Sequence, residues 1–112
     1  MKGTRGQIYN SSSDFFQLEG SAVMLLTSAA AQSVCFEASG HSLVVVRVEG
    51  GIWRNPGFEA RLDCIWDGRD PPLSQIEATS NNLRASDMIR EESGVHDVFI
   101  ITTAPLSGYR HN

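Results

Sequence analysis

A β-branched run, a turn and an alternating run follow one another in the middle of the chain, and this succession constrains the fold most. The letters LVVVRVEGGIW (43–53) are too short and too rich in valine for a helix. FEARLDCIW (58–66) alternates apolar and polar side chains, as a half-buried strand does. RNPG (54–57) lies between them and is typical of a turn. The three segments predict an antiparallel hairpin with a long loop, whose first strand is central, covered on both faces, and can bulge at Gly50 and Gly51.

Two helices are predicted, one before this hairpin in the sequence and one after it. The first begins at Thr27 or Ser28, whose hydroxyl can cap it, and ends at Gly40, which takes a left-handed conformation without steric penalty. The second begins with the capping box Ser74–Glu77 and extends to about Ser93.

The remaining segments are less regular. Asn81 and Asn82 are poor helix formers, so the second helix can break there, and Gly94 is a plausible stop. Residues 95–104 predict a last strand, ended by Pro105, with 105–112 as a tail. Residues 1–14 are polar and rich in glycine and serine, so we expect them to be loosely ordered or a weakly held edge, and 15–26 to be extended or a short helix.

This order of elements predicts the α+β class (mixed α/β), with one mixed sheet of three to five strands and two main helices packed on it. A chain of 112 residues fits a single domain, 1–112. The helix between residues 58–66 and 95–104 permits a parallel crossover between these two strands.

Charge and hydropathy narrow the class of partner. A net charge of −4 argues against direct binding of nucleic acid and favours a basic protein partner. The longest apolar run near the N-terminus, AVMLL, is far short of the roughly 20 residues that span a membrane, and also too short for a secretory signal. We therefore expect a cytoplasmic protein that does not bind membranes. Cys35 and Cys64 fall at positions that predict burial and form no CxxC motif, so the sequence offers no support for a zinc or redox site.

Acidic residues cluster around the end of the second predicted strand. Glu59 and Asp63 lie on its polar face, and Asp67 and Asp70 lie in the following turn. Their spacing matches no known cation-binding loop, and Arg61 and Arg69, which lie among them, would neutralise them locally. Three interpretations remain: a metal site, surface ion pairs, or an acidic patch that faces a partner.

No catalytic motif is visible in the chain. His96 and Asp97 would point to opposite faces of a strand, and the serines and cysteines lack a recognisable base. Trp53 can cover the edge of the core or contact a partner. A small enzyme or ligand-binding domain with an acid–base group at Asp63 or His96 is the alternative to a binding protein.

Two stretches, VVVRVEGGIWRNPGFEARLDCIWDG and NNLRASDMIREESGVHDVFIITTAPLSGY, resemble small bacterial immunity proteins. These are the antitoxins paired with contact-dependent growth inhibition and related polymorphic or colicin-type toxins. The resemblance implies a cytoplasmic protein that binds one toxin domain, usually a nuclease, and blocks its active site or substrate groove without catalysis, cofactor or metal. It carries over no functional residues and leaves the oligomeric state open.

Acidic side chains on this protein could imitate the phosphates that a nuclease binds. We therefore expect the toxin-facing surface to comprise Asp63, Asp67 and Asp70, together with Glu49, Trp53 and Glu59. Glu91 and Glu92, at the negative end of the second helix, form a competing patch.

Overall fold

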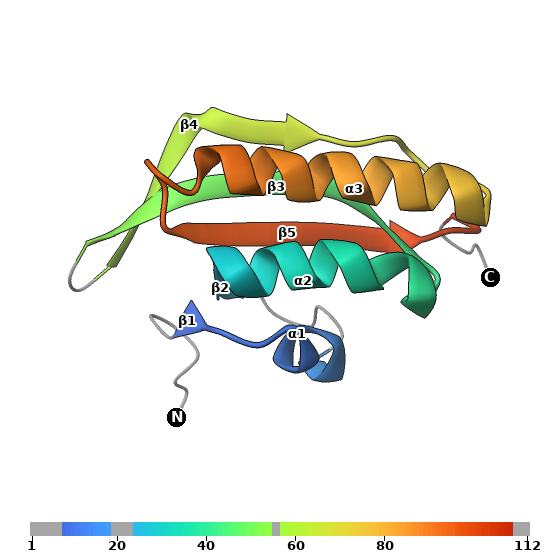
Figure 1. Ribbon diagram of the computed structural model, residues 1–112, viewed down its shortest axis with the longest axis horizontal. Coiled ribbons are helices and arrows are strands. Elements are labelled where there is room, and N and C mark those ends of the chain that lie inside the picture. Colours follow the sequence, from blue (N-terminus) through green and yellow to red (C-terminus); the bar gives the residue numbers. More distant parts are fainter. Residues whose placement is uncertain (1–7, 19–23, 55–56, 109–112) are drawn as a thin grey trace.

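Five strands form one mixed sheet in the order β1-β2-β5-β3-β4 (Figure 1). The computed structural model describes residues 8–18, 24–54 and 57–108, without the side chains of residues 54 and 57–63. β1 pairs with β2 in parallel, and the other neighbouring strands are antiparallel. The strands are β1 (Ile8–Tyr9), β2 (Leu25–Thr27), β3 (Leu43–Arg54), β4 (Gly57–Asp67) and β5 (Val98–Pro105).

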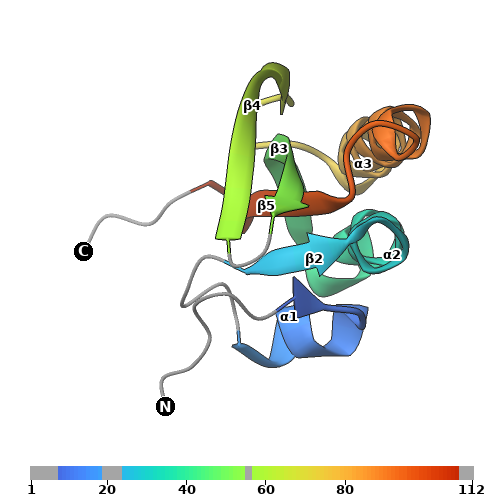
Figure 2. The same ribbon diagram turned by 90° about the vertical axis from the view of Figure 1, so that its left-hand side faces the viewer.

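Among the described residues, three α-helices accompany the sheet: α1 (Ser12–Leu18), α2 (Ser28–Ala38) and α3 (Gln75–Glu92). Figure 2 shows α2 and α3 side by side on the same face of the sheet, and no helix of the described residues lies on the opposite face. The predicted α+β class, the mixed sheet and its two main helices are therefore confirmed. No helix in the described part of the chain is long and apolar enough to cross a membrane.

The central hairpin forms as predicted, with one correction. β3 and β4 pair as far as Arg54 opposite Gly57, so the expected long loop is wrong. The register shifts between Glu49 and Gly51, because Glu49 lies opposite Ile65 whereas Gly51 lies opposite Ala60. The predicted bulge is thus confirmed. The described side chains of β4, from Cys64 to Asp67, alternate between inward and outward as predicted.

β3 is internal to the sheet, between β5 and β4, as its valines predicted. The first half of β3 is covered on both faces, as predicted, because the consecutive residues Val44 and Val45 are both fully buried. The two long helices nevertheless share one face of the sheet. β4 and β5 both run antiparallel to β3 and hence parallel to each other, so the helix between them makes the expected crossover, with β3 in the gap.

Both predicted helix starts are confirmed by their caps. The Thr27 hydroxyl accepts a hydrogen bond from Ala30 N (3.2 Å), and Ser74 and Glu77 form the complete capping box. The predicted glycine stop after α2 is wrong, because Gly40 lies inside a short 3₁₀ turn and the left-handed residue is Ser42, at φ 61°. Ser42 reverses the chain there, and its carbonyl accepts a hydrogen bond from Leu106 N (3.0 Å).

The N-terminal segments are short elements at the edge of the sheet. Residues 8–14 form the two-residue edge strand β1 and the first turn of α1. Residues 15–26, expected to be extended or a short helix, contain the end of α1 and the start of β2.

The core lies between the sheet and the two long helices. α2 buries its predicted face, which includes Ala30, Val34 and Ala38. α3 is continuous, and its buried face includes Ala78, Asn82, Ala85 and Ile89. The largest fully buried side chain on the sheet is Phe99 of β5.

Candidate functional site

Two of the predicted acidic residues meet on the helix-free face of the sheet. Arg47 of β3 lies directly opposite Asp67 of β4, and its Nε donates a hydrogen bond to Asp67 Oδ1 (2.8 Å). Arg47 Nη1 also lies 3.5 Å from Glu49 Oε2. The bond to Arg47 lowers the pKa of Asp67 and raises that of Arg47, so both groups stay charged. Sequence reasoning missed Arg47, because only the register of the sheet brings it to Asp67.

We call the end of β4 with Glu49 and Asp67 the acidic edge. The segment after β4 joins the acidic edge to the start of α3. Arg69 N donates a hydrogen bond to Asn81 Oδ1 (2.8 Å), and Arg69 Nη2 lies 3.5 Å from Glu77 Oε2. Asp70 follows in the same segment and is exposed. Asp70 therefore lies close along the chain to Asp67, and both side chains face solvent.

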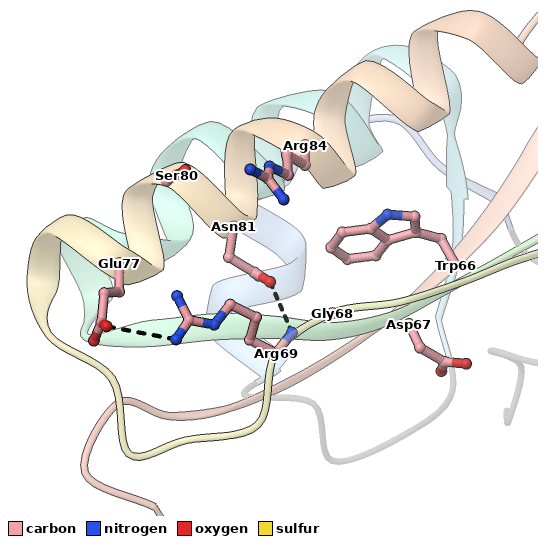
Figure 3. Close-up of a pocket in the computed structure, with 8 residues that line it drawn as sticks. All are labelled: Trp66, Asp67, Gly68, Arg69, Glu77, Ser80, Asn81 and Arg84. Atoms are coloured by element: carbon pink, nitrogen blue, oxygen red, sulfur yellow. Dashed lines mark hydrogen bonds and ion pairs between the residues drawn. The ribbon is translucent and has the colours of Figure 1, made fainter.

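A pocket of about 240 Å³ opens between this segment and α3. Figure 3 shows Trp66 and Asp67 leaving β4 in opposite directions, with the indole ring toward α3 and the carboxylate away from it. The predicted inward position of Trp66 is confirmed, because it packs against the main core, but the ring also borders the pocket. The lining residues are Trp66, Asp67, Gly68, Arg69, Glu77, Ser80, Asn81 and Arg84.

The charges around this pocket are balanced, with two carboxylates and two guanidinium groups among its lining residues. Arg84 is exposed, and it forms no ion pair with another side chain of the described part of the chain. The pocket is thus a polar hollow beside the acidic edge rather than an acidic site itself.

The pocket exists because β4 leaves β3 early and two asparagines of α3 take its place. Asn82 Oδ1 accepts a hydrogen bond from Val45 N (2.8 Å), and Asn81 Nδ2 donates one to Val45 O (2.8 Å). Asn82 Nδ2 also donates to Leu43 O (3.2 Å). These side chains form hydrogen bonds with the backbone N–H and C=O groups of β3 that β4 does not pair with. The helix break considered at these asparagines does not occur.

Gly68 allows the close approach of α3 at this point. An added Cβ would overlap Val45 O and would lie 2.8 Å from Asn81 Oδ1 and 2.9 Å from Trp66 Cζ3. Its own N donates a hydrogen bond to Val46 O (2.9 Å), which is where the pairing of the hairpin ends.

The other predicted residues lie elsewhere or outside the described part. Trp53 is half-buried near the end of β3, where its N donates a hydrogen bond to Asp97 Oδ1 (2.8 Å). Glu91 and Glu92 end α3, about 11–12 Å along the helix axis beyond Arg84, which is the last pocket residue of that helix. Glu59 and Asp63 are in β4, but their side chains lie outside the described residues.

The structure places the alternative acid–base group differently from the prediction. His96 precedes β5, lies in the turn after α3 and is buried at 5% exposure. Its Nδ1 lies 3.2 Å from Glu92 Oε1, and both lie near Cys64. Cys35 and Cys64 are both buried, as predicted. Burial raises the pKa of the Cys35 thiol to about 12, which makes it a poor nucleophile or metal ligand.

Comparison with known proteins gives a consistent match. Residues 24–104 match the model of the family described as Colicin-E5 Imm protein. The immunity protein CdiI of Burkholderia pseudomallei is 56% identical over 101 residues, covering 90% of this chain and 93% of the relative. A colicin-E5 immunity protein of Escherichia coli is 35% identical over 81 residues, covering 70% of this chain and 96% of the relative. The chain therefore belongs to the colicin-E5 immunity protein family.

Proposed function

We propose that this protein is the immunity component of a contact-dependent growth inhibition or colicin-type toxin system, and that it neutralises its cognate toxin domain by binding it. The observation that carries this function is the family match over residues 24–104, together with the 56% identity to CdiI over most of both chains. We propose further that it acts in the cytoplasm by occupying the toxin, without catalysis or cofactor.

The proposed target is a nuclease domain with a basic substrate groove. A groove that binds phosphates is rich in lysine and arginine. The net charge of this chain is −4, and carboxylates outnumber arginines among the described side chains. This balance favours encounter with a basic partner and disfavours direct binding of the nucleic acid.

We propose that the toxin contacts the edge of the sheet where β4 ends. Glu49, Asp67 and Asp70 supply negative charge there, and the side chain of Asp67 is 64% exposed. The hydrogen bond from Arg47 holds the Asp67 carboxylate in one orientation, so less side-chain entropy is lost on binding. The pocket beside Trp66 offers a recess for a polar side chain of the toxin. Asp63 and Glu59 belong to the same proposed surface through their positions in β4.

A protection assay tests the proposed function. The toxin domain encoded next to this gene is expressed in a sensitive host with or without this protein, and growth is measured. Growth should be restored by this protein but not by an immunity protein from an unrelated system, and the toxin should co-purify with it. Failure both to protect and to co-purify with any neighbouring toxin domain would refute the function.

Matched double variants test the proposed surface. Asp67→Asn with Asp70→Asn should weaken toxin affinity at least about tenfold, because two desolvated charge contacts are lost. Asp14→Asn with Glu37→Gln, on α1 and α2, removes the same charge elsewhere and should change affinity little. The pair Glu91→Gln and Glu92→Gln tests the competing patch. If that pair weakens binding and the Asp67 pair does not, the surface lies at the far end of α3.

A further inference from the structure

We propose that Cys64, Glu92 and His96 form a binding site for a divalent transition-metal ion, with Zn²⁺ the best fit. Their donor atoms, one sulfur, one carboxylate oxygen and one ring nitrogen, all lie within 4.8 Å of one another. This site goes beyond the proposed toxin binding and does not depend on it. Sequence spacing gave no sign of it, because Cys64 comes from β4, Glu92 from the end of α3 and His96 from the segment that follows this helix.

The state of His96 points to a ligand. The residue is only 5% exposed, and its Nδ1 has no hydrogen-bond partner among the described residues. Glu92 Oε1 lies 3.2 Å from this nitrogen, but the contact lacks the angles of a hydrogen bond. A buried ring nitrogen without a partner is costly, and a metal ion between it and the carboxylate would satisfy both groups.

The distances suit tetrahedral zinc. Zn²⁺ binds histidine nitrogen and carboxylate oxygen at about 2.0–2.2 Å, so two such ligands on a tetrahedron lie roughly 3.4 Å apart. The observed separation of 3.2 Å between Glu92 and His96 is close to this value. The sulfur, within 4.8 Å of both, needs to move by about 1 Å toward the ion to reach a ligand distance near 2.3 Å.

The backbone holds these ligands in place. His96 N donates a hydrogen bond to Glu92 O (2.8 Å), which fixes the turn that brings the two side chains together. Cys64 is 1% exposed and packs against Gly50, where an added Cβ would overlap its sulfur. Glu92 keeps 40% of its side chain exposed and so gives the ion a path from solvent.

The donor set selects the metal. A thiolate and an imidazole favour Zn²⁺ and related transition metals over Mg²⁺ and Ca²⁺, which prefer oxygen ligands alone. Three protein ligands leave a fourth tetrahedral position for water. The ion would link β4 to the end of α3, so binding should stabilise the folded chain.

Zinc titration of the full chain, purified without a histidine tag and stripped of metal, tests the proposal. Calorimetry should show one Zn²⁺ bound per chain, and zinc should raise the thermal unfolding midpoint by several degrees. Co²⁺ in place of zinc should give a thiolate-to-metal charge-transfer band. Absence of zinc binding by the unmodified chain would overturn the proposal.

Neighbouring residues supply matched controls. Glu92→Gln should lower zinc affinity by at least about tenfold, because mutation of a residue that merely hydrogen-bonds to a metal ligand already lowers metal affinity by that factor. Glu91→Gln should leave the zinc affinity unchanged. Cys64→Ala should abolish the cobalt band and Cys35→Ala should retain it. Equal affinity of the Glu92 and Glu91 variants, or loss of the band in the Cys35 variant instead, would assign the metal to another place. Glu92 is partly exposed, so its variant should fold even if the Cys64 variant does not.

Discussion

The side chain of Asn82, a residue of α3, forms hydrogen bonds with the backbone of β3 that a neighbouring strand would otherwise form. Its amide is 1% exposed and meets both a donor and an acceptor of the β3 backbone, at Val45 and Leu43. Helix propensity ranks asparagine low, and on that ground a break was considered. The tertiary hydrogen bonds outweigh this small local cost.

Asn82→Ala should therefore destabilise the fold by about 2–3 kcal/mol, because Val45 N is left buried without an acceptor. The free energy of unfolding in urea measures this effect. Ser80→Ala, at an exposed position of the same helix, should stay within about 0.5 kcal/mol of the parent. Equal stabilities of the two variants would contradict the role given to Asn82.

Gly50 is required for a different reason, the close packing of Cys64 on β3. An added Cβ would overlap Cys64 Sγ and lie 3.1 Å from Phe99 Cε2, so Gly50→Ala should cost at least about 2 kcal/mol. Cys64→Ala should recover part of this loss, with a coupling energy of about 1 kcal/mol or more in a double-mutant cycle of urea unfolding. Gly40→Ala, where nothing lies within 4 Å of the new Cβ, is the control. Strict additivity of the two changes would exclude the steric explanation.

The inward direction of Trp66 was predictable from alternation alone, and it is confirmed. Asp67 is exposed, as expected, but it is the last residue of β4 rather than part of the following turn. The partners of these residues were not predictable, because Arg47 and Arg84 reach the site from a neighbouring strand and from α3. Such contacts depend on strand register and helix docking, which no local pattern determines.

At the scale of elements, the start of α3 shows how far local chemistry determines structure. Ser74 Oγ accepts from Glu77 N (3.1 Å), while Glu77 Oε1 accepts from Ser74 N (2.8 Å). The four residues contain all the atoms involved, so this helix start was predictable. The end of α3 was also predicted within one residue, because the helix ends at Glu92 with Ser93 as its C-cap. The end of α2 was not, because the left-handed residue after it is Ser42 rather than Gly40, and the Ser42 carbonyl accepts a hydrogen bond from Leu106 N.

The capping box also predicts a dependence of stability on pH. The backbone N–H and the hydroxyl of Ser74 lower the pKa of Glu77 below its usual 4.5. The charged carboxylate thus favours the folded state, and its contribution is complete above pH 4.5 and lost as the pH falls through the lowered value. Glu77→Gln should be less stable than the parent at neutral pH, and the difference in urea unfolding should narrow below pH 4.5. A difference that is constant with pH would show that the carboxylate charge contributes nothing.

Sheet topology lies beyond what the individual elements reveal. The pattern predicted a central hairpin and a last strand parallel to its second arm, and these are present. The sequence pattern did not predict that β5 lies between β2 and β3, nor that α2 and α3 lie on the same face of the sheet. Strand order depends on which apolar faces meet in three dimensions, and several orders bury similar areas.

At the scale of the whole molecule, the net charge predicts how the rate of toxin binding depends on salt. With a charge of −4, association with a basic toxin domain should be fast at low salt and slow steeply as salt rises, because ions screen the long-range attraction. Asp67→Asn with Asp70→Asn should lower the association rate and flatten its salt dependence more than Asp14→Asn with Glu37→Gln, although both pairs change the net charge equally.

Stopped-flow mixing at several salt concentrations measures these rates. If both pairs reduce the rate by the same factor, net charge alone steers the encounter and the edge beside β4 has no special part in it. If only the Asp67 pair acts, the attraction is focused at that edge. The proposed surface requires this second result. Carboxylates at the contact approach the cations of the toxin more closely than carboxylates on the opposite face do, so salt screens their attraction less.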